Sequence, residues 1–393
     1  MSEKVKIGLI GLGNIGKTHA KYLEKMEDVE VVGVCDLVRE KADKFAKQLN
    51  TVAYYNHTDL FEKSGLEAVI IAVPHYDHPP ISIDAFERGI HVMCEKPISV
   101  HVNDGIKAVD AYEKAKQIHP EIVYAIMFQE RTLPHYKKIK EILESGELGQ
   151  LTRVTWIDTT RFRSQSYYDS GGWRATWAGE GGGILTNQCP HNLDMYQWLF
   201  GLPSYVNGFA DIGKYHNIEV EDEVTAFFRH SNGMVGHFIV STSESPGTYR
   251  FEIIGENGKL VYENGELILH KNRVSMLKHI KESKKGAEFA ESWRTEIPLN
   301  KDLPGMHAYV TQKFIDKILK KDGELIAHAT EGLNSVMLAN AIMLSSFNKC
   351  EVALPMENGD EFEAKLNELI KTSRFVKMVN DKEENDMQST FAK

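Results

Sequence analysis

The sequence predicts an α/β protein with a doubly wound parallel sheet near its N-terminus and an open, mainly antiparallel sheet in its second half. Three observations support this fold class. Apolar strand-like runs alternate with helical segments over the first third of the chain. A glycine-rich turn joins the first of these runs to the first helix. Beyond residue 150 the strand-like runs become longer, alternate polar with apolar residues and are separated by few helices.

Short apolar runs in the first third are expected to be strands, and the segments between them helices. The expected strands are Val5–Ile10, Val29–Cys35, Ala68–Val73, His91–Cys94 and Ile122–Phe128, and the expected helices are Lys17–Met26, Arg39–Leu49, Ile81–Arg88 and Asp104–Gln117. The run Ala68–Val73 is apolar throughout, as in a strand that is buried on both faces of a parallel sheet. The alternation of strands and helices therefore predicts a doubly wound parallel sheet.

The pattern changes after about residue 129, where we place a domain boundary. The expected strands of the second domain are Arg153–Thr159, Glu223–Arg229, Met234–Ser241 and Arg250–Gly255, with hairpin turns at Asn232-Gly233 and Asn257-Gly258 and helices at Leu133–Ser145, Ile184–Phe200, Met306–Lys320 and Thr330–Phe347. We expect this domain to span residues 130–375, and a charged, mobile tail to follow over 376–393. The lysine-rich segment Lys271–Gly286 is expected to be an exposed insertion.

Composition narrows the class of protein. A chain of 393 residues is long enough for two domains, and its net charge of -10 argues against general binding to nucleic acid or anionic membranes. The four cysteines lie far apart without metal-ligand spacing, which favours free thiols in a reducing compartment and no metal site. No secretory signal or membrane-length apolar run is visible, so we expect a cytoplasmic protein.

The strongest local signal is the motif Gly11-Leu-Gly13-Asn14-Ile15-Gly16, which joins the first expected strand to the first expected helix. In this context Gly11 allows a tight turn, Gly13 lets the backbone approach a pyrophosphate and Gly16 permits close packing of helix and strand. The helix N-terminus offers free N–H groups and a positive dipole to phosphates. The motif predicts a dinucleotide-binding Rossmann domain. The alternative is a glycine-rich turn that binds no ligand.

Asp36 follows the second expected strand, 20 residues after Gly16. A carboxylate at this place accepts hydrogen bonds from the ribose hydroxyls of NAD and repels the 2′-phosphate of NADP. Arg39 lies close enough in sequence to weaken that preference, and Asp36 alone would also fit a solvated turn. We expect the cofactor to be NAD, with NADP less favoured.

Three further residues follow the strand Ala68–Val73, where the strands of an open α/β sheet end at the ligand crevice. Pro74 would stiffen the loop beside the cofactor, and His78 is a candidate cofactor contact. His75 and His78 would equally suit exposed loop positions. Sequence alone leaves these two interpretations of the histidines balanced.

Lys96 lies in the motif Glu95-Lys96-Pro97, at the end of the short strand His91–Cys94. A lysine that is partly desolvated beside a positively charged nicotinamide has a lowered pKa, and it can hold the oxygen of an alcohol that loses hydride. Glu95 is expected to contribute to the same cofactor site. The alternative is a surface lysine paired with Glu95.

A final cluster lies in the expected helix that starts at residue 184. Asn187, His191, Asp194 and Trp198 follow helical spacing and would share one face, and an amide, an imidazole and a carboxylate together suit proton transfer to a hydroxyl. Pro190 is awkward inside a helix, so Asn187 would alternatively be an N-cap with Pro190 in the first turn. His191 would alternatively be a core histidine, and Asp194 would only orient a neighbour.

The sequence resembles the Gfo/Idh/MocA family, that is, oxidoreductases of the glucose–fructose oxidoreductase and inositol dehydrogenase type. The resemblance rests on Gly11–Gly16 with Asp36, on Glu95-Lys96-Pro97, and on Gly181–Gly183 through His191 and Asp194. It implies an N-terminal Rossmann domain, a C-terminal α/β domain whose large open sheet pairs between subunits in a homodimer or homotetramer, and a site between the domains. Carried over by position, Lys96 and His191 are the catalytic pair.

This resemblance implies NAD-dependent hydride transfer to or from a secondary alcohol of a sugar, a glycoside or a cyclitol. Many members have Asp where this chain has Asn187, which we expect to orient the substrate or His191. Forked donors and aromatic faces suit a sugar, and the expected substrate wall consists of Arg163, Tyr167, Trp173 and Arg174. Two alternatives remain: a glycosidase or lyase that retains NAD and oxidises C3 only transiently, and a non-catalytic NAD-binding protein.

Overall fold

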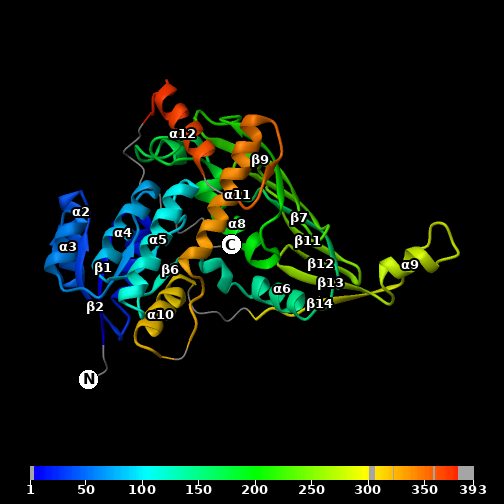
Figure 1. Cartoon of the computed structure of the whole chain (residues 1–393), viewed down its shortest axis with the longest axis horizontal. Helices are drawn as coiled ribbons and strands as arrows, with labels where there is room; N and C mark the ends of the chain where they lie inside the picture. Colours follow the sequence, from blue (N-terminus) through cyan, green and yellow to red (C-terminus); the bar gives the residue numbers. More distant parts are fainter. Residues whose placement is uncertain (1–3, 301–305, 322, 357–358, 379–393) are drawn as a thin grey trace.

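The computed structural model describes residues 4–300, 306–321, 323–356 and 359–378. Its two sheets lie side by side, and helix α11 (Ala329–Asn348) packs against elements of both (Figure 1). The strands of the first sheet come from residues 5–126, and those of the second come from residue 151 onward. The predicted fold class is confirmed.

The first sheet has six parallel strands in the order β3-β2-β1-β4-β5-β6. Its strands are β1 (Val5–Ile10), β2 (Val29–Cys35), β3 (Ala53–Tyr54), β4 (Ala68–Ile71), β5 (His91–Cys94) and β6 (Tyr124–Ile126), and its helices are α1 (Asn14–Leu23), α2 (Arg39–Leu49), α3 (His57–Lys63), α4 (His78–Glu87) and α5 (Val102–Ile118). Strand β1 lies between β2 and β4, so the order of strands runs outward from β1 in both directions and reverses between β1 and β4. Ligands bind at such a switch point, beyond the carboxyl ends of the strands.

The second sheet has nine strands in the order β14-β13-β12-β11-β7-β10-β9-β8-β15, and only β7 and β10 pair in parallel. Its strands are β7 (Leu151–Asp158), β8 (Tyr205–Ile212), β9 (Glu221–Arg229), β10 (Val235–Ser241), β11 (Tyr249–Gly255), β12 (Gly258–Glu263), β13 (Glu266–Asn272), β14 (Ser292–Ile297) and β15 (Val352–Ala353). Both predicted hairpins form, between β9 and β10 and between β11 and β12. Alternate residues of β7 and β9 are buried, so one face of the sheet packs on the core.

The remaining helices cover the sheets and connect them. They are α6 (Pro134–Glu144), α7 (Gln165–Asp169), α8 (Pro190–Phe200), α9 (Met276–Glu282), α10 (Met306–Ile318) and α12 (Asp360–Thr372), with 3₁₀ turns η1 (His75–Asp77) and η2 (Gln129–Thr132). Helix α10 follows the second sheet in sequence but packs on the first one. Its residues Val310, Phe314 and Ile315 share a core cluster with Leu9 and Met93.

The continuous helix expected over 184–200 is wrong. Residues Ile184–Gln188 form a single π-helical turn, η3, and α8 begins only at Pro190, with Cys189 as its N-cap. Proline lacks the N–H that would continue a helix, and its ring clashes with the preceding turn, so it is accepted only in the first turn of a helix. The N-cap role considered for Asn187 is therefore also wrong, because Asn187 lies two residues before the cap.

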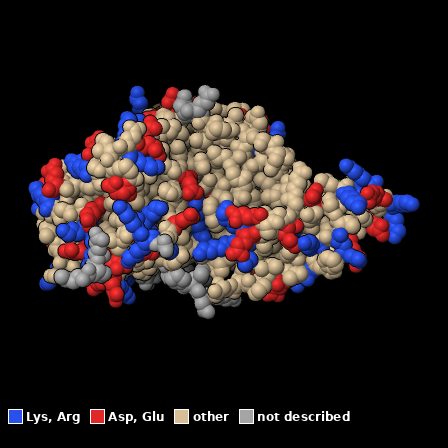
Figure 2. All heavy atoms as spheres, turned by 60° about the horizontal axis from the view of Figure 1, so that its bottom comes forward, with Lys and Arg blue, Asp and Glu red and all other residues tan. Residues whose placement is uncertain are grey.

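The lysine-rich insertion is exposed, as expected. Helix α9 has no buried residue and projects from the end of the second sheet (Figure 1). Lysine and arginine side chains gather on this projection (Figure 2). Beyond residue 378 the expected mobile tail lies outside the described residues. Within the described residues, no helix is both long enough and apolar enough to cross a membrane.

Candidate active site

The glycine motif forms the turn between β1 and α1. Gly11 has a φ of +87°, and a Cβ atom there would lie 2.3 Å from the carbonyl oxygen of Ala72. A Cβ on Gly16 would lie 1.9 Å from the oxygen of Gly11, whereas a Cβ on Gly13 would meet nothing within 4 Å. Gly11 and Gly16 are thus required by the path of the chain, and the backbone at Gly13 borders open space. No side chain caps the helix that follows, so its first N–H groups remain available to a phosphate.

Asp36 ties the glycine turn to the end of β2. Its Oδ2 accepts a hydrogen bond from the backbone N–H of Leu12 (2.9 Å), and its Oδ1 accepts one from Val38 (2.8 Å). The side chain is half-buried, so the carboxylate is more than a solvated turn residue. The guanidinium of Arg39 lies over the ring of Tyr55, 4.1 Å from its centroid.

The residues after β4 hold the backbone next to the candidate site through contacts with backbone oxygens. His78 is buried, and its Nδ1 and Nε2 lie 2.6 Å from the oxygen of Pro97 and 2.9 Å from that of Val73. Both ring nitrogens therefore face backbone carbonyls, and His78 holds the chain beside Lys96 instead of offering a free nitrogen. Pro74 is exposed and precedes η1, in which His75 contacts the backbone oxygen of Glu180 (3.1 Å).

Glu95 and Lys96 follow β5. Glu95 is buried with His19, whose Nε2 lies 2.8 Å from its Oε1. Burial by itself raises the pKa of Glu95, but the hydrogen bond and charge of His19 outweigh it and lower the pKa to about 2. The Nζ of Lys96 donates to the backbone oxygen of Asn187 (2.9 Å). Burial lowers the pKa of Lys96, an effect that the charge of Glu95 opposes and that of Arg161 strengthens.

His191 is the second residue of α8 and is 4% exposed. Its Nε2 lies 2.9 Å from the side-chain nitrogen of Gln129, and within the described part of the chain its Nδ1 has no partner. Burial holds the pKa of His191 well below its usual range, and the charges of Lys96 and Arg161 add to that effect. The imidazole is therefore neutral at pH 7. Gln129 was not singled out in the sequence, because it is 62 positions away and belongs to no motif.

Asn187 does not contact His191, contrary to one of the two roles expected for it. Its amide nitrogen donates to Oε1 of Glu180 and lies 3.5 Å from the hydroxyl of Tyr167. Glu180 is fully buried, and its Oε2 accepts from the backbone N–H of Ala175 (2.6 Å). Burial raises the pKa of Glu180, against the opposing charge of Arg174. Sequence analysis did not single out Glu180. The only feature that could have drawn attention to it is its position immediately before the three glycines 181–183.

The four residues expected to form the substrate wall come together around Tyr167 of α7. The guanidinium carbons of Arg163 and Arg174 lie 4.9 and 4.7 Å from the Tyr167 ring centroid. Arg174 also donates to the Tyr167 hydroxyl (2.9 Å) and lies 4.7 Å from the ring centroid of Trp173. All four side chains are half-buried. The side chain of Asn187 connects this group to the backbone oxygen that holds Lys96.

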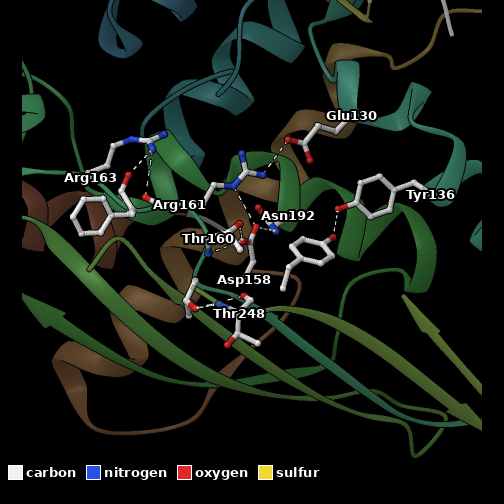
Figure 3. A network of polar contacts seen from close by, with 11 residues as sticks. Glu130, Tyr136, Asp158, Thr160, Arg161, Arg163, Asn192 and Thr248 are labelled. Carbon is white, nitrogen blue, oxygen red and sulfur yellow. Dashed lines mark hydrogen bonds and ion pairs between the residues drawn. The ribbon is translucent and has the colours of Figure 1, made fainter. Parts of the chain in front are cut away.

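A buried network of charges includes Asn192, the residue after His191 (Figure 3). Arg161 donates to Glu130 of η2 (3.0 Å) and to Asp158 at the end of β7 (3.2 Å). Asp158 also accepts from Asn192, the residue after His191 (3.0 Å). The network thereby fixes η2, β7 and the start of α8 relative to one another.

Asp194 turns away from His191. It accepts two hydrogen bonds from Arg131 (2.8 and 2.6 Å), and the guanidinium of Arg131 lies 5.3 Å from the ring centroid of Trp198. This buried pair anchors α8 to η2, so Asp194 positions a helix and takes no part in the candidate active site. Among the residues that the structure describes, no group of three or more His, Cys, Asp or Glu side chains is arranged to hold a metal ion.

The fold and the glycine turn together define a protein with a dinucleotide-binding Rossmann domain. Residues 5–121 match the model of the GFO/IDH/MocA oxidoreductase family, NAD-binding Rossmann fold, and residues 136–261 match that of the GFO/IDH/MocA C-terminal domain. The chain belongs to the Gfo/Idh/MocA family, and the resemblance seen in its motifs is confirmed.

Dehydrogenases are among its relatives. Myo-inositol 2-dehydrogenase of Thermotoga maritima is 25% identical over 272 residues, which are 66% of this chain and 75% of that protein. Glucose-6-phosphate 3-dehydrogenase of Bacillus subtilis is 23% identical over 282 residues, 68% and 76% of the two chains. The WlbA dehydrogenase of Chromobacterium violaceum, solved in complex with NADH and UDP-GlcNAcA, has a TM-score of 0.76 and 26% identity, with 91% of this chain and 98% of that one covered. The protein is accordingly an enzyme of the dehydrogenase type.

Proposed function

We propose that the protein oxidises, reversibly, a secondary alcohol of a sugar, a glycoside or a cyclitol with NAD. The observation that carries the proposal is the hydrogen bond from Nζ of Lys96 to the backbone oxygen of Asn187, which brings Lys96 to the turn that immediately precedes the helix of His191. Lys96 follows a strand of the first sheet, His191 is the second residue of helix α8, and burial together with the charge of Lys96 lowers the pKa of His191. Relatives that act on inositol and on glucose 6-phosphate support the substrate class.

The residues of the glycine turn suit NAD. The open space at Gly13 and the first turn of α1, with Asn14, Ile15 and Gly16, would receive the pyrophosphate. Asp36 would bind the ribose hydroxyls, because its carboxylate keeps acceptor capacity after its two backbone hydrogen bonds. A 2′-phosphate would meet the same negative charge, which favours NAD over NADP. NAD supplies the hydride acceptor of the reaction.

His191 and Lys96 divide the proton chemistry. His191 is neutral and removes the hydroxyl proton as general base while the carbinol carbon loses hydride. Lys96 donates one hydrogen bond to the backbone oxygen of Asn187. It donates another to the substrate oxygen and stabilises the negative charge that develops there. Asn187 thus acts through its backbone as a positioning residue for Lys96.

A screen for NADH formation tests this function. Purified protein and NAD are mixed with sugars, inositols and glycosides, and absorbance of NADH is followed with wild type and with His191→Ala as control. If wild type forms NADH steadily and His191→Ala does not, the result supports a dehydrogenase. Release of an aglycone without added NAD and without net NADH would instead identify the NAD-retaining glycosidase or lyase, and would refute the proposal.

We also propose that the chain forms a homo-oligomer through the uncovered face of the second sheet. Large apolar side chains of β8 lie on that face, including Phe209 at 70% exposure and Tyr205 at 41%. Exposed apolar area of this kind favours association with a second copy. Light scattering coupled to size-exclusion chromatography tests it, and Phe209→Lys is expected to shift the protein toward the monomer. A wild-type mass of one chain would contradict it.

A further inference from the structure

The substrate wall contains two arginines without an acidic partner. Among the described residues, no carboxylate lies within 4.0 Å of the guanidinium of Arg163 or Arg174. Nη1 of Arg163 donates only to the backbone oxygens of Arg161 (3.4 Å) and Phe162 (2.9 Å), and its Nε is buried without any partner (Figure 3). Arg174 donates to the neutral hydroxyl of Tyr167 (2.9 Å).

The contrast with other partly buried arginines makes this unusual. Arg131, Arg153, Arg161 and Arg250 each form at least one ion pair with a carboxylate. Arg161 lies only two positions from Arg163 and pairs with both Glu130 and Asp158. The fold therefore supplies acids to neighbouring arginines and supplies none to the two that border Tyr167.

The nearest acids are already engaged. Both carboxylate oxygens of Glu180 accept hydrogen bonds, from Ala175 and from Asn187. Lys377 adds a further positive charge at this wall, because its Nζ donates to the backbone oxygen of Tyr168. The oxygen atom of the Gln188 side chain is buried and unpartnered nearby, and Gln188 also contacts the Tyr167 hydroxyl (3.2 Å). The wall thus presents unfilled donors, one unfilled acceptor and a surplus of positive charge.

We infer that the substrate is an anionic carbohydrate or cyclitol, whose carboxylate or phosphate binds between Arg163 and Arg174. Half-buried guanidinium groups are costly without a counter-ion, and their planar forks match both kinds of anion. Contacts run from Tyr167 through Asn187 to Lys96, so the anion lies at the end of the substrate opposite the reacting alcohol. The inference rests on the proposed function, which places that alcohol at Lys96 and His191.

The test compares charged and neutral probes of the same ring. kcat/KM for NAD reduction is measured with D-glucuronate, with D-glucose 6-phosphate and with D-glucose, for wild type and for Arg163→Gln, Arg174→Gln and the control Arg153→Gln on the second sheet. We expect at least one anionic probe to exceed D-glucose by tenfold or more. Each wall variant should lower kcat/KM for that probe at least tenfold more than for D-glucose, and Arg153→Gln should not. The preferred probe distinguishes a carboxylate from a phosphate.

A binding measurement separates this inference from the proposed reaction. Calorimetric titration of the NADH-loaded protein with D-glucuronate or D-glucose 6-phosphate reports the anion site without turnover. Binding that is lost in Arg174→Gln supports the anion site, even if no probe yields NADH and the proposed function fails. Equal losses for charged and neutral probes, or no binding of either anionic probe to the loaded protein, would overturn the inference.

Discussion

The side-chain nitrogen of Gln129 lies 2.9 Å from Nε2 of His191, and both residues are buried. A hydrogen bond between them needs one donor and one acceptor, so the amide and the tautomer of the imidazole determine each other. With the amide nitrogen facing Nε2, the amide donates and Nδ1 carries the proton; with the amide turned over, its oxygen accepts from Nε2–H, and Nδ1 keeps the lone pair that can receive the proton of an alcohol. Asn187, four positions before His191, does not contact the imidazole, and Gln129 anchors the ring instead.

Replacing Gln129 by Leu should lower kcat for alcohol oxidation by about 10- to 100-fold, because the imidazole loses its anchor and its fixed tautomer. NAD affinity should be unchanged, since the hydrogen bond of the Gln129 side chain is to His191 and not to the glycine turn. Stopped-flow kinetics and NAD titration measure the two quantities, and Gln129→Asn serves as a control that keeps the amide but shortens its reach. A kcat within twofold of wild type would show that the contact is only structural.

Gln129→Glu should move the acidic limb of the kcat/KM profile to higher pH. A carboxylate at this place favours the imidazolium and raises the pKa of His191, which is otherwise held low by burial and by Lys96 and Arg161. The limb reports the essential base of the free enzyme. The wild-type limb should accordingly lie at lower pH than that of an ordinary histidine. An identical profile for both proteins would exclude His191 as that base.

Asn187→Asp tests the contact with Glu180. Two carboxylates would then face each other in a buried place, one of them would take up a proton, and the pKa of the pair would rise. A folded-state pKa above the unfolded value gives stability that is present at low pH and lost as pH rises, so unfolding free energy should fall by about 1–3 kcal/mol between pH 5 and 8. Combining Asn187→Asp with Glu180→Gln restores an amide–carboxylate pair and should remove this slope. A slope that persists in the double variant would refute the explanation.

Asp36→Ser should narrow the preference for NAD over NADP by about tenfold, that is about 1.4 kcal/mol, because the negative charge beside the 2′-position is removed. Serine retains an acceptor for the N–H of Leu12 or Val38, so the turn loses less support than with alanine. Dissociation constants of both dinucleotides provide the measurement. Wild-type protein that binds NADP as tightly as NAD would contradict the assignment.

His216, which contacts the backbone of Arg163 in the substrate wall, should make the free energy of unfolding depend on pH. Its Nδ1 lies 2.9 Å from Oδ2 of Asp222, and its Nε2 lies 2.9 Å from the backbone oxygen of Arg163. Burial lowers the pKa of His216, but these two hydrogen bonds outweigh burial and raise it. The stabilisation is then complete below the unfolded pKa of about 6.5 and is lost as pH rises through the folded one. Urea unfolding should show the largest difference between wild type and His216→Phe at pH 5–6 and a smaller one at pH 8; a constant difference would argue against it.

Local patterns in the sequence were enough to predict most of the first sheet. The bounds of β1, β2, β5 and α2 agree with the expected ones, because strand, turn and helix signals there lie next to one another. The strands β8, β12, β13 and β14 were not predicted. Their pattern is that of a partly exposed sheet, and their partners in the sheet decide their conformation.

The site shows the same division. The glycine turn, Lys96 and His191 belong to motifs that the sequence shows, and their roles stay predictions, whereas Gln129, Glu180 and the network around Arg161 depend on contacts between distant residues. Asn187 was misplaced for a related reason: the helical spacing of 187 and 191 applies only to an unbroken helix, and Pro190 interrupts it.

Because helix α10 packs on the first sheet although it follows the second in sequence, it limits which C-terminal halves can be exchanged between relatives. It is encoded after the second sheet, yet Phe314 and Ile315 fill the core under the first, and His307 contacts the ring of His19, the partner of Glu95 (6.1 Å between centroids). A gene fragment that ends at residue 129 would leave this apolar surface uncovered. Recombination that exchanges the C-terminal half between two relatives therefore also replaces part of the cofactor domain's interior. A chimera of this kind should fold only where the incoming α10 matches the resident α1 and β5.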